Sequence, residues 1–151
     1  MAERRGVLKE IINKYKYESV RCAAVALGEL LGGLIEGYYT IVPLPTIRRH
    51  VRERGFDHIG LLARRIVRVC GCEVDALLFR EKNAVQVGSD IETRKSQAKQ
   101  AYGLMRPPDA DKRYLLLDDV CTTGSTLLAA EKILRRAGAR SISVAVIAKS
   151  V

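Results

Sequence analysis

Two adjacent carboxylates and several hydroxyl side chains stand close together in the second half of this chain. They occupy the segment Asp118-Asp119-Val120-Cys121-Thr122-Thr123-Gly124-Ser125-Thr126. Carboxylates accept hydrogen bonds from vicinal hydroxyls, whereas Thr and Ser hydroxyls donate hydrogen bonds to phosphate oxygens. Acids and hydroxyls in one short segment therefore favour a sugar phosphate as the ligand, and a ribose phosphate fits best.

The elements expected around this segment suit a phosphate site. Leu115-Leu116-Leu117 is apolar throughout, which is typical of a buried parallel strand, and a helix is expected to start at Ser125. Ligands of open α/β sheets bind outside the carboxyl ends of strands, and a helix start offers free N–H groups and a positive dipole end. Gly124 lets the backbone approach closely. The alternative is a helix N-cap behind two solvated acids, which explains less because a cap needs only one such residue.

The spacing of apolar residues predicts strands alternating with helices along the rest of the chain. Helices are expected near residues 7–15, 21–35, 57–69 and 125–137, and strands near 38–42, 74–79, 114–117 and 142–147. A cationic loop over 48–55 and a polar segment over 80–108 complete the chain. This alternation predicts an α/β fold with a mostly parallel twisted sheet flanked by helices. We expect one domain over 1–151, with an N-terminal helical segment (1–37) and a ligand-binding core (38–151).

Composition restricts the class of protein and its location. The 151 residues carry a formal net charge of +9, and aromatic residues make up only 5%. No apolar run approaches the roughly 18 residues of a membrane span, and the first residues lack the apolar stretch of a signal peptide. We therefore expect a cytoplasmic protein without membrane association. The basic surplus attracts anions, either nucleic acid or phosphorylated small molecules.

The four cysteines give no sign of a metal site. Cys22, Cys70, Cys72 and Cys121 form no C-x-x-C pair, so we expect reduced thiols and no metal held by the protein itself. Cys121 is interpreted as a small residue that the loop requires.

The segment 118–126 resembles the signature of type I phosphoribosyltransferases. The resemblance implies that Asp118 and Asp119 hold the ribose hydroxyls of phosphoribosyl pyrophosphate and that 122–126 hold its 5′-phosphate. It also implies Mg²⁺ carried in with the pyrophosphate. Upstream, Val42-Pro43-Leu44-Pro45, then Arg48-Arg49, then Arg52-Glu53-Arg54-Gly55-Phe56-Asp57 are similar to the ComF family of predicted phosphoribosyltransferases. That family is linked by name to DNA uptake in competent bacteria, and the likeness runs from about residue 6 to residue 149.

Arginines in the loop after the first core strand are the expected ligands of the pyrophosphate. Guanidinium groups bind phosphate oxygens through paired, charge-assisted hydrogen bonds. Arg52 and Arg54 are the first candidates, with Arg48 and Arg49 behind them. The catalytic residues would then be Asp118, Asp119, Arg52 and Arg54. The alternative is a solvated, arginine-rich surface.

The sequence departs from the family pattern at several places. The cysteine-rich zinc module that often begins family members has no counterpart in this sequence. Asp57 and Gln97 stand where the family has Asn, while Gln86, Arg94 and the stretch to Ala101-Tyr102 fit the family's mobile loop less closely. Purine-salvaging relatives carry an Asp general base where this chain has Thr122. His50 and His58 are expected at the surface, so the sequence offers no other base.

Two functions from different classes follow from these residues. The first is an enzyme that binds magnesium phosphoribosyl pyrophosphate and transfers its phosphoribosyl group to a nitrogen acceptor, which the region 35–46 would recognise. The second is a non-catalytic module that binds nucleotide or single-stranded DNA, or a sensor of phosphoribosyl pyrophosphate. Candidate partners besides that ligand are single-stranded DNA, a protein of the competence machinery, and a second copy in a homodimer.

Overall fold

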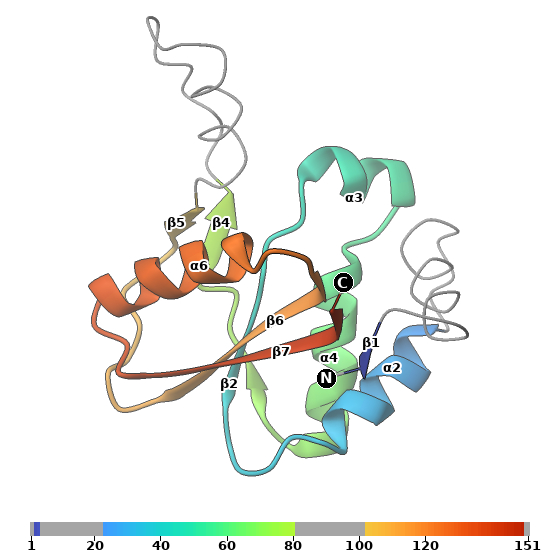
Figure 1. The fold of residues 1–151 in the computed structure, drawn as a ribbon, viewed down its shortest axis with the longest axis horizontal. Coiled ribbons are helices and arrows are strands. Elements are labelled where there is room, and N and C mark those ends of the chain that lie inside the picture. Colours follow the sequence, from blue (N-terminus) through green and yellow to red (C-terminus); the bar gives the residue numbers. More distant parts are fainter. Residues whose placement is uncertain (1, 4–22, 81–101, 150–151) are drawn as a thin grey trace, which may run out of the picture.

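A five-stranded parallel sheet forms the centre of the protein (Figure 1). The computed structural model describes residues 2–3, 23–80 and 102–149. The strands follow the order β1 (Ala2–Glu3), β7 (Ser141–Lys149), β6 (Arg113–Cys121), β2 (Thr40–Pro43) and β3 (Glu73–Val74). All four strand pairs are parallel, which confirms the predicted α/β class.

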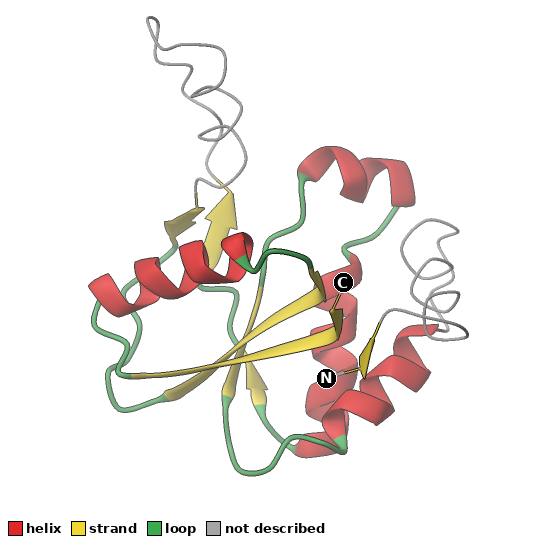
Figure 2. Cartoon of the chain, in the orientation of Figure 1, coloured by secondary structure: helices red, strands yellow, loops and turns green. Residues whose placement is uncertain are grey.

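Helices cover both faces of this sheet (Figure 2). The alternation of side chains along β6 shows the arrangement: Leu115 and Leu117 join one core cluster, whereas Tyr114 and Leu116 join the other. The first cluster includes residues of α2 (Ala23–Gly32) and α4 (His58–Cys70), and the second includes residues of α6 (Ser125–Arg136). The apolar strand 114–117 is therefore buried from both sides, as its composition predicts.

Two glycines allow α2 to pack closely on α4. A Cβ atom at Gly28 would lie 2.5 Å from Cβ of Arg65, and one at Gly32 would lie 2.7 Å from Cβ of Val69. Gly28 and Gly32 are four residues apart in α2, as are Arg65 and Val69 in α4, so each pair lies on one face of its helix. Small residues at these positions thus set the distance between the two helices.

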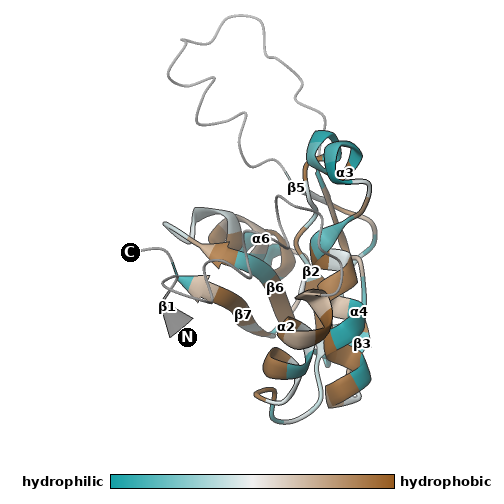
Figure 3. Cartoon of the chain, turned by 90° about the vertical axis from the view of Figure 1, so that its right-hand side faces the viewer, coloured by the Kyte–Doolittle hydropathy of each residue, from teal (hydrophilic) through white to brown (hydrophobic). Residues whose placement is uncertain are grey.

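Two expectations about the middle of the chain are wrong. Residues 48–55 are not a loop: they form helix α3 (Arg48–Arg54), which ends at Gly55 in the left-handed conformation. The single strand expected over 74–79 is two strands, β3 in the main sheet and β4 (Leu78–Arg80) in a separate antiparallel pair with β5 (Tyr102–Leu104). The run of charged residues in 48–54 hides a helix because none of its side chains is buried, so it lacks apolar periodicity. Figure 3 shows α3 as mostly hydrophilic.

Other elements lie close to their predicted positions. Helix α6 ends at Arg136, within one residue of the predicted end, and the predicted cap Gly138 has a φ of +112°. The N–H of Gly138 donates to the carbonyl of Arg135 and that of Ala139 to the carbonyl of Leu134, the bond pattern of a Schellman motif.

The helix expected over 7–15 and the loop residues Gln86, Arg94 and Gln97 lie outside the described residues. No helix in the described ranges is long and apolar enough to cross a membrane.

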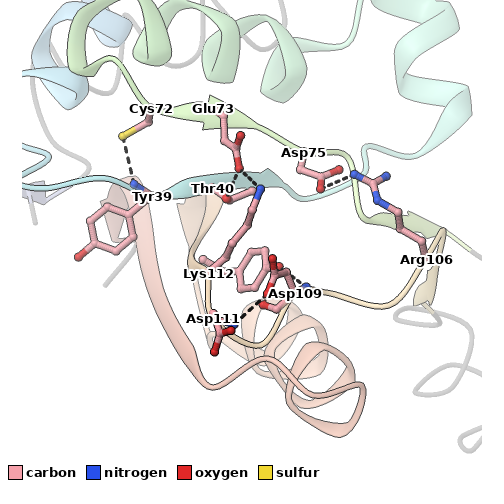
Figure 4. A network of polar contacts seen from close by, with 10 residues as sticks. Tyr39, Thr40, Cys72, Glu73, Asp75, Arg106, Asp109, Asp111 and Lys112 are labelled. Carbon is pink, nitrogen blue, oxygen red and sulfur yellow. Dashed lines mark hydrogen bonds and ion pairs between the residues drawn. The ribbon is translucent and has the colours of Figure 1, made fainter.

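Polar contacts tie the strands together at the amino edge of the sheet (Figure 4). Glu73 accepts hydrogen bonds from Thr40 Oγ1 at 2.6 Å and from Lys112 Nζ at 2.5 Å. Arg106 pairs with Asp75. The two ion pairs link Glu73 of β3, and Asp75 directly after β3, to the segment that precedes β6.

Candidate functional site

The sheet reverses its direction of winding between β2 and β6. From β2 the chain passes through α3 and α4 to β3, whereas from β6 it passes through α6 to β7 on the other side of the sheet. Such a switch point opens a crevice at the carboxyl ends of the two strands, and ligands of open α/β sheets bind there. A pocket of about 190 Å³ lies at this point, lined by Leu44, Pro45, Thr46, Ile47, His50, Arg54, His58, Ile59, Arg80, Tyr102, Asp118, Asp119, Val120 and Thr126.

The two adjacent carboxylates of β6 occupy different environments. Asp119 continues the series of Leu115 and Leu117, and its side chain meets the start of α4. It is 4% exposed, whereas Asp118 is half-buried. Asp118 lies instead on the side of Tyr102, where its charge acts on the phenol. The structure thus brings both predicted acids to the pocket but buries only one of them.

His58 is the partner of the buried acid, and the expectation that it lies at the surface is wrong. Its Nε2 lies 3.0 Å from Oδ2 of Asp119, and its Nδ1 lies 3.0 Å from Nη1 of Arg54. Both side chains of the His58–Asp119 pair are at most 6% exposed. The spacing of apolar residues could have predicted this burial. His58 stands four and eight residues before Leu62 and Ile66, so all three lie on one face of the helix, and both apolar residues are buried.

The hydroxyl-rich turn leads from β6 into α6. Gly124 has a φ of +74°, which only glycine adopts without strain, and it is the N-cap residue of α6. The Oγ1 of Thr123 donates to Oγ of Ser125 at 3.0 Å. Thr126 lines the pocket, while Thr122, Thr123 and Ser125 are exposed. The first turn of α6 therefore lies beside the two acids, and Thr126 lines the same pocket as they do.

The four candidate arginines separate into two groups. Arg54 is half-buried and lines the pocket, whereas Arg48, Arg49 and Arg52 are exposed and do not line it. The Nε of Arg49 donates to Glu53 Oε1 at 2.7 Å. The helical conformation of 48–54 causes this separation, since neighbouring residues of a helix point in different directions.

Arg80 and Tyr102, which the sequence interpretation did not select, close the pocket on the side of the β4–β5 pair. The Nε of Arg80 donates to the carbonyl oxygen of Pro45 at 3.0 Å, and its Nη2 donates to the hydroxyl of Tyr102 at 3.3 Å. Burial raises the pKa of Tyr102, the Arg80 guanidinium opposes this shift, and the Asp118 carboxylate adds to it. Tyr102 therefore remains a neutral phenol that can both donate and accept hydrogen bonds.

The parallel sheet, its switch point and this pocket define the class as an open α/β protein with a ligand site at the carboxyl ends of its strands. Residues 51–150 match the family described as "Phosphoribosyl transferase domain", so the chain belongs to that family. Glutamine phosphoribosylpyrophosphate amidotransferase from B. subtilis shares the fold, with a TM-score of 0.63 and 18% identity, over 90% of this chain and 30% of that one.

Relatives of known name indicate the ComF-type branch of the family. "DNA utilization protein YhgH" of Escherichia coli K12 is 32% identical over 69% of this chain and 46% of its own length. "Competence protein F" of Haemophilus influenzae is 31% identical over 69% of this chain and 47% of its own. The chain thus spans about half the length of these curated relatives, and the resemblance to the ComF family is confirmed.

Proposed function

We propose that this protein is a phosphoribosyltransferase that binds magnesium phosphoribosyl pyrophosphate and transfers the phosphoribosyl group to a nitrogen acceptor. The ligand would lie across the carboxyl ends of β2 and β6. The observation that carries this proposal is the position of Asp118, Asp119 and the start of α6 on one pocket at the switch point of the sheet. This arrangement offers acceptors for ribose hydroxyls next to donors for the 5′-phosphate.

The pyrophosphate would lie toward α3, where Arg54 lines the pocket. A guanidinium donates paired hydrogen bonds to phosphate oxygens and stabilises the negative charge that develops on the leaving group. Arg48, Arg49 and Arg52 would contribute through the positive potential around the entrance. The carboxylates of Asp118 and Asp119 would stabilise the positive charge that develops on the ribose ring as the bond to pyrophosphate breaks.

The chemistry of the site suits Mg²⁺ that arrives with the ligand. Mg²⁺ is usually bound by one or two carboxylates together with phosphate oxygens and water, and the half-buried carboxylate of Asp118 lines the pocket. The described ranges contain no group of three or more His, Cys, Asp or Glu side chains that could hold a metal ion alone. The bound ion would neutralise part of the pyrophosphate charge.

Binding of this ligand predicts an increase in the melting temperature of the protein. A ligand present at 100 times its Kd stabilises the folded state by about 2.7 kcal/mol, which corresponds to roughly 5–10 °C for a chain of this size. The measurement is a thermal melt with Mg²⁺ and phosphoribosyl pyrophosphate, compared with Mg²⁺ and inorganic phosphate as the control. Calorimetric titration that shows no binding at millimolar ligand would contradict the proposal.

The acceptor is identified by a second experiment, which measures pyrophosphate release with a panel of bases, ammonia and amines.

A second candidate function is handling of single-stranded DNA without catalysis. The names of the relatives and the net charge of +9 favour it. The low aromatic content of 5% counts against it, since base stacking on aromatic side chains is the usual means of holding single strands.

A cytoplasmic location, a homodimer and a partner from the competence machinery are further predictions.

A further inference from the structure

His58 lies between the two charged groups that the proposed function uses on opposite sides of the ligand. It begins α4, and its ring contacts both β6 and α3. Nε2 is 3.0 Å from Oδ2 of Asp119, and Nδ1 is 3.0 Å from Nη1 of Arg54. The chain Arg54–His58–Asp119 therefore connects the proposed pyrophosphate end of the pocket to the proposed ribose end.

The chemistry of the neighbours determines the tautomer of the ring. A guanidinium has only donors, so the contact with Arg54 is a hydrogen bond only if Nδ1 accepts. The proton of a neutral imidazole then resides on Nε2, which donates to the Asp119 carboxylate. The other carboxylate oxygen, Oδ1, accepts from the backbone N–H of Val120 at 2.7 Å. Each oxygen of Asp119 thus has a donor, and these two donors fix the orientation of the carboxylate.

We propose that His58 is a positioning residue that orients the Asp119 carboxylate for the ribose hydroxyls. This inference rests on the proposed function. With Nδ1 occupied by Arg54, the ring has no lone pair to take a proton from the acceptor, so His58 acts through its neighbours and does not act as the general base. Its effect should fall on the affinity for the sugar more than on the affinity for free pyrophosphate, because Asp119 loses a donor that fixes its orientation, whereas Arg54 keeps its charge beside the pocket.

The experiment compares two substitutions of His58 in the full chain. In His58→Gln the amide N–H can replace the donor to Asp119, whereas His58→Leu removes the donor and introduces an apolar side chain. Calorimetry measures the binding of ribose 5-phosphate and of inorganic pyrophosphate. We expect His58→Leu to weaken ribose 5-phosphate binding by about tenfold or more and pyrophosphate binding by less than about threefold, whereas His58→Gln stays within about threefold of the wild type for both.

A matched control separates positioning from a general loss of stability. Tyr114 is 1% exposed at the amino end of β6, and its hydroxyl donates to the carbonyl of Asp109 and accepts from the N–H of the same residue. Tyr114→Phe removes these buried hydrogen bonds far from the pocket, so it should lower stability and leave both affinities unchanged. An equal loss of sugar affinity in this control would overturn the proposal, because destabilisation alone would then explain the effect.

The outcomes separate this inference from the proposed function. If the wild type binds ribose 5-phosphate and folded His58→Leu binds it equally well, the positioning role is wrong and the proposed function stands. If folded His58→Gln is as impaired as His58→Leu, the N–H donor is not the basis of the effect. If the wild type binds neither ribose 5-phosphate nor phosphoribosyl pyrophosphate, the proposed function fails, and this inference fails with it.

A measurement on the wild type alone removes any dependence on the folding of variants. Long-range ¹H–¹⁵N NMR spectra distinguish the two tautomers of a neutral imidazole. We expect the Nε2–H tautomer for His58. A ring protonated at Nδ1 and bare at Nε2 would overturn the proposal, because such a ring cannot donate to Asp119.

Discussion

At the scale of single residues, the site depends on which face of β6 each acid occupies. Side chains alternate along a strand, so two adjacent carboxylates cannot point the same way. Asp119 therefore meets His58 on the side of α4, and Asp118 lies toward Tyr102. The acids would contact different ribose hydroxyls, and Asp119 also pairs with the buried side chain of His58.

The position of Arg54 predicts unequal roles for the two arginines that the sequence selected together. Replacing Arg52 and Arg54 with Ala should weaken pyrophosphate binding far more than ribose 5-phosphate binding. We expect Arg54→Ala to account for most of this loss, about tenfold or more, because a hydrogen bond from a charged group is worth about 1.5–3 kcal/mol. Arg52→Ala should cost less than about threefold, since an exposed charge acts through a screened field.

The measurement is a calorimetric titration with inorganic pyrophosphate and with ribose 5-phosphate. Arg136→Ala is the matched control, because it removes the same charge from an exposed position in the last turn of α6. Equal losses for both ligands in Arg54→Ala would show that Arg54 is not a pyrophosphate ligand. A larger loss in Arg52→Ala than in Arg54→Ala would reverse the assignment.

At the scale of elements, packing of α2 on α4 determines where the amino end of α4 lies. That end carries His58, and the helix is amphipathic, with His58, Ile59, Leu62 and Ile66 buried. Gly28 and Gly32 let the backbone of α2 approach Arg65 and Val69 of α4. Helix α2 therefore supports the site without contributing a side chain to it.

Substitution of Gly28 tests this packing. A Cβ at Gly28 would lie 2.5 Å from Cβ of Arg65, so Gly28→Ala forces the helices apart at a cost of about 1–3 kcal/mol. The gain of about 1 kcal/mol in helix propensity offsets part of that cost. We expect a net loss in the free energy of unfolding, measured by urea denaturation. Glu29→Ala, at the exposed neighbouring position, should change it by less than about 0.5 kcal/mol. Stabilisation by Gly28→Ala would show that the contact is not tight.

At the scale of the whole molecule, charge separates the two candidate functions. A net charge of +9 steers any polyanion toward the surface, whether it is a nucleotide or DNA. The affinity for DNA arises largely from neutralised phosphates and falls steeply with salt. Under the proposed function, the affinity for a sugar phosphate in the pocket would depend instead on two carboxylates, which would repel DNA.

The double substitution Asp118→Asn with Asp119→Asn therefore distinguishes an enzyme from a nucleic-acid module. We expect loss of sugar-phosphate binding, with single-stranded DNA binding unchanged or slightly stronger, because two negative charges are removed. Both affinities are measured at two salt concentrations, and a melt confirms that the variant is folded. Retained sugar-phosphate affinity would show that the site assignment is wrong. If the wild type binds DNA tightly at physiological salt and the variant does not, the acids serve DNA recognition.

The sequence by itself determined the class of fold and the core of the candidate site. The triple leucine before Asp118, the turn at Gly124 and the helix after Ser125 are local patterns, and local patterns decide strands, turns and helix ends. The end of α6 just before Gly138 follows for the same reason, since only a glycine readily adopts the φ of +112° found there. The resemblance of 42–57 to the ComF family also required nothing beyond the order of residues.

Only the tertiary structure decided which of these residues meet. The contact between His58 and Asp119 joins positions 61 apart in the sequence, and no local pattern encodes a contact between the start of one helix and the end of a distant strand. The helical form of 48–54 placed Arg54 in the pocket and left its neighbours exposed. Arg80 and Tyr102 joined the site because β4 and β5 pair with each other and leave the main sheet. Packing determines these placements, and packing depends on the whole chain at once.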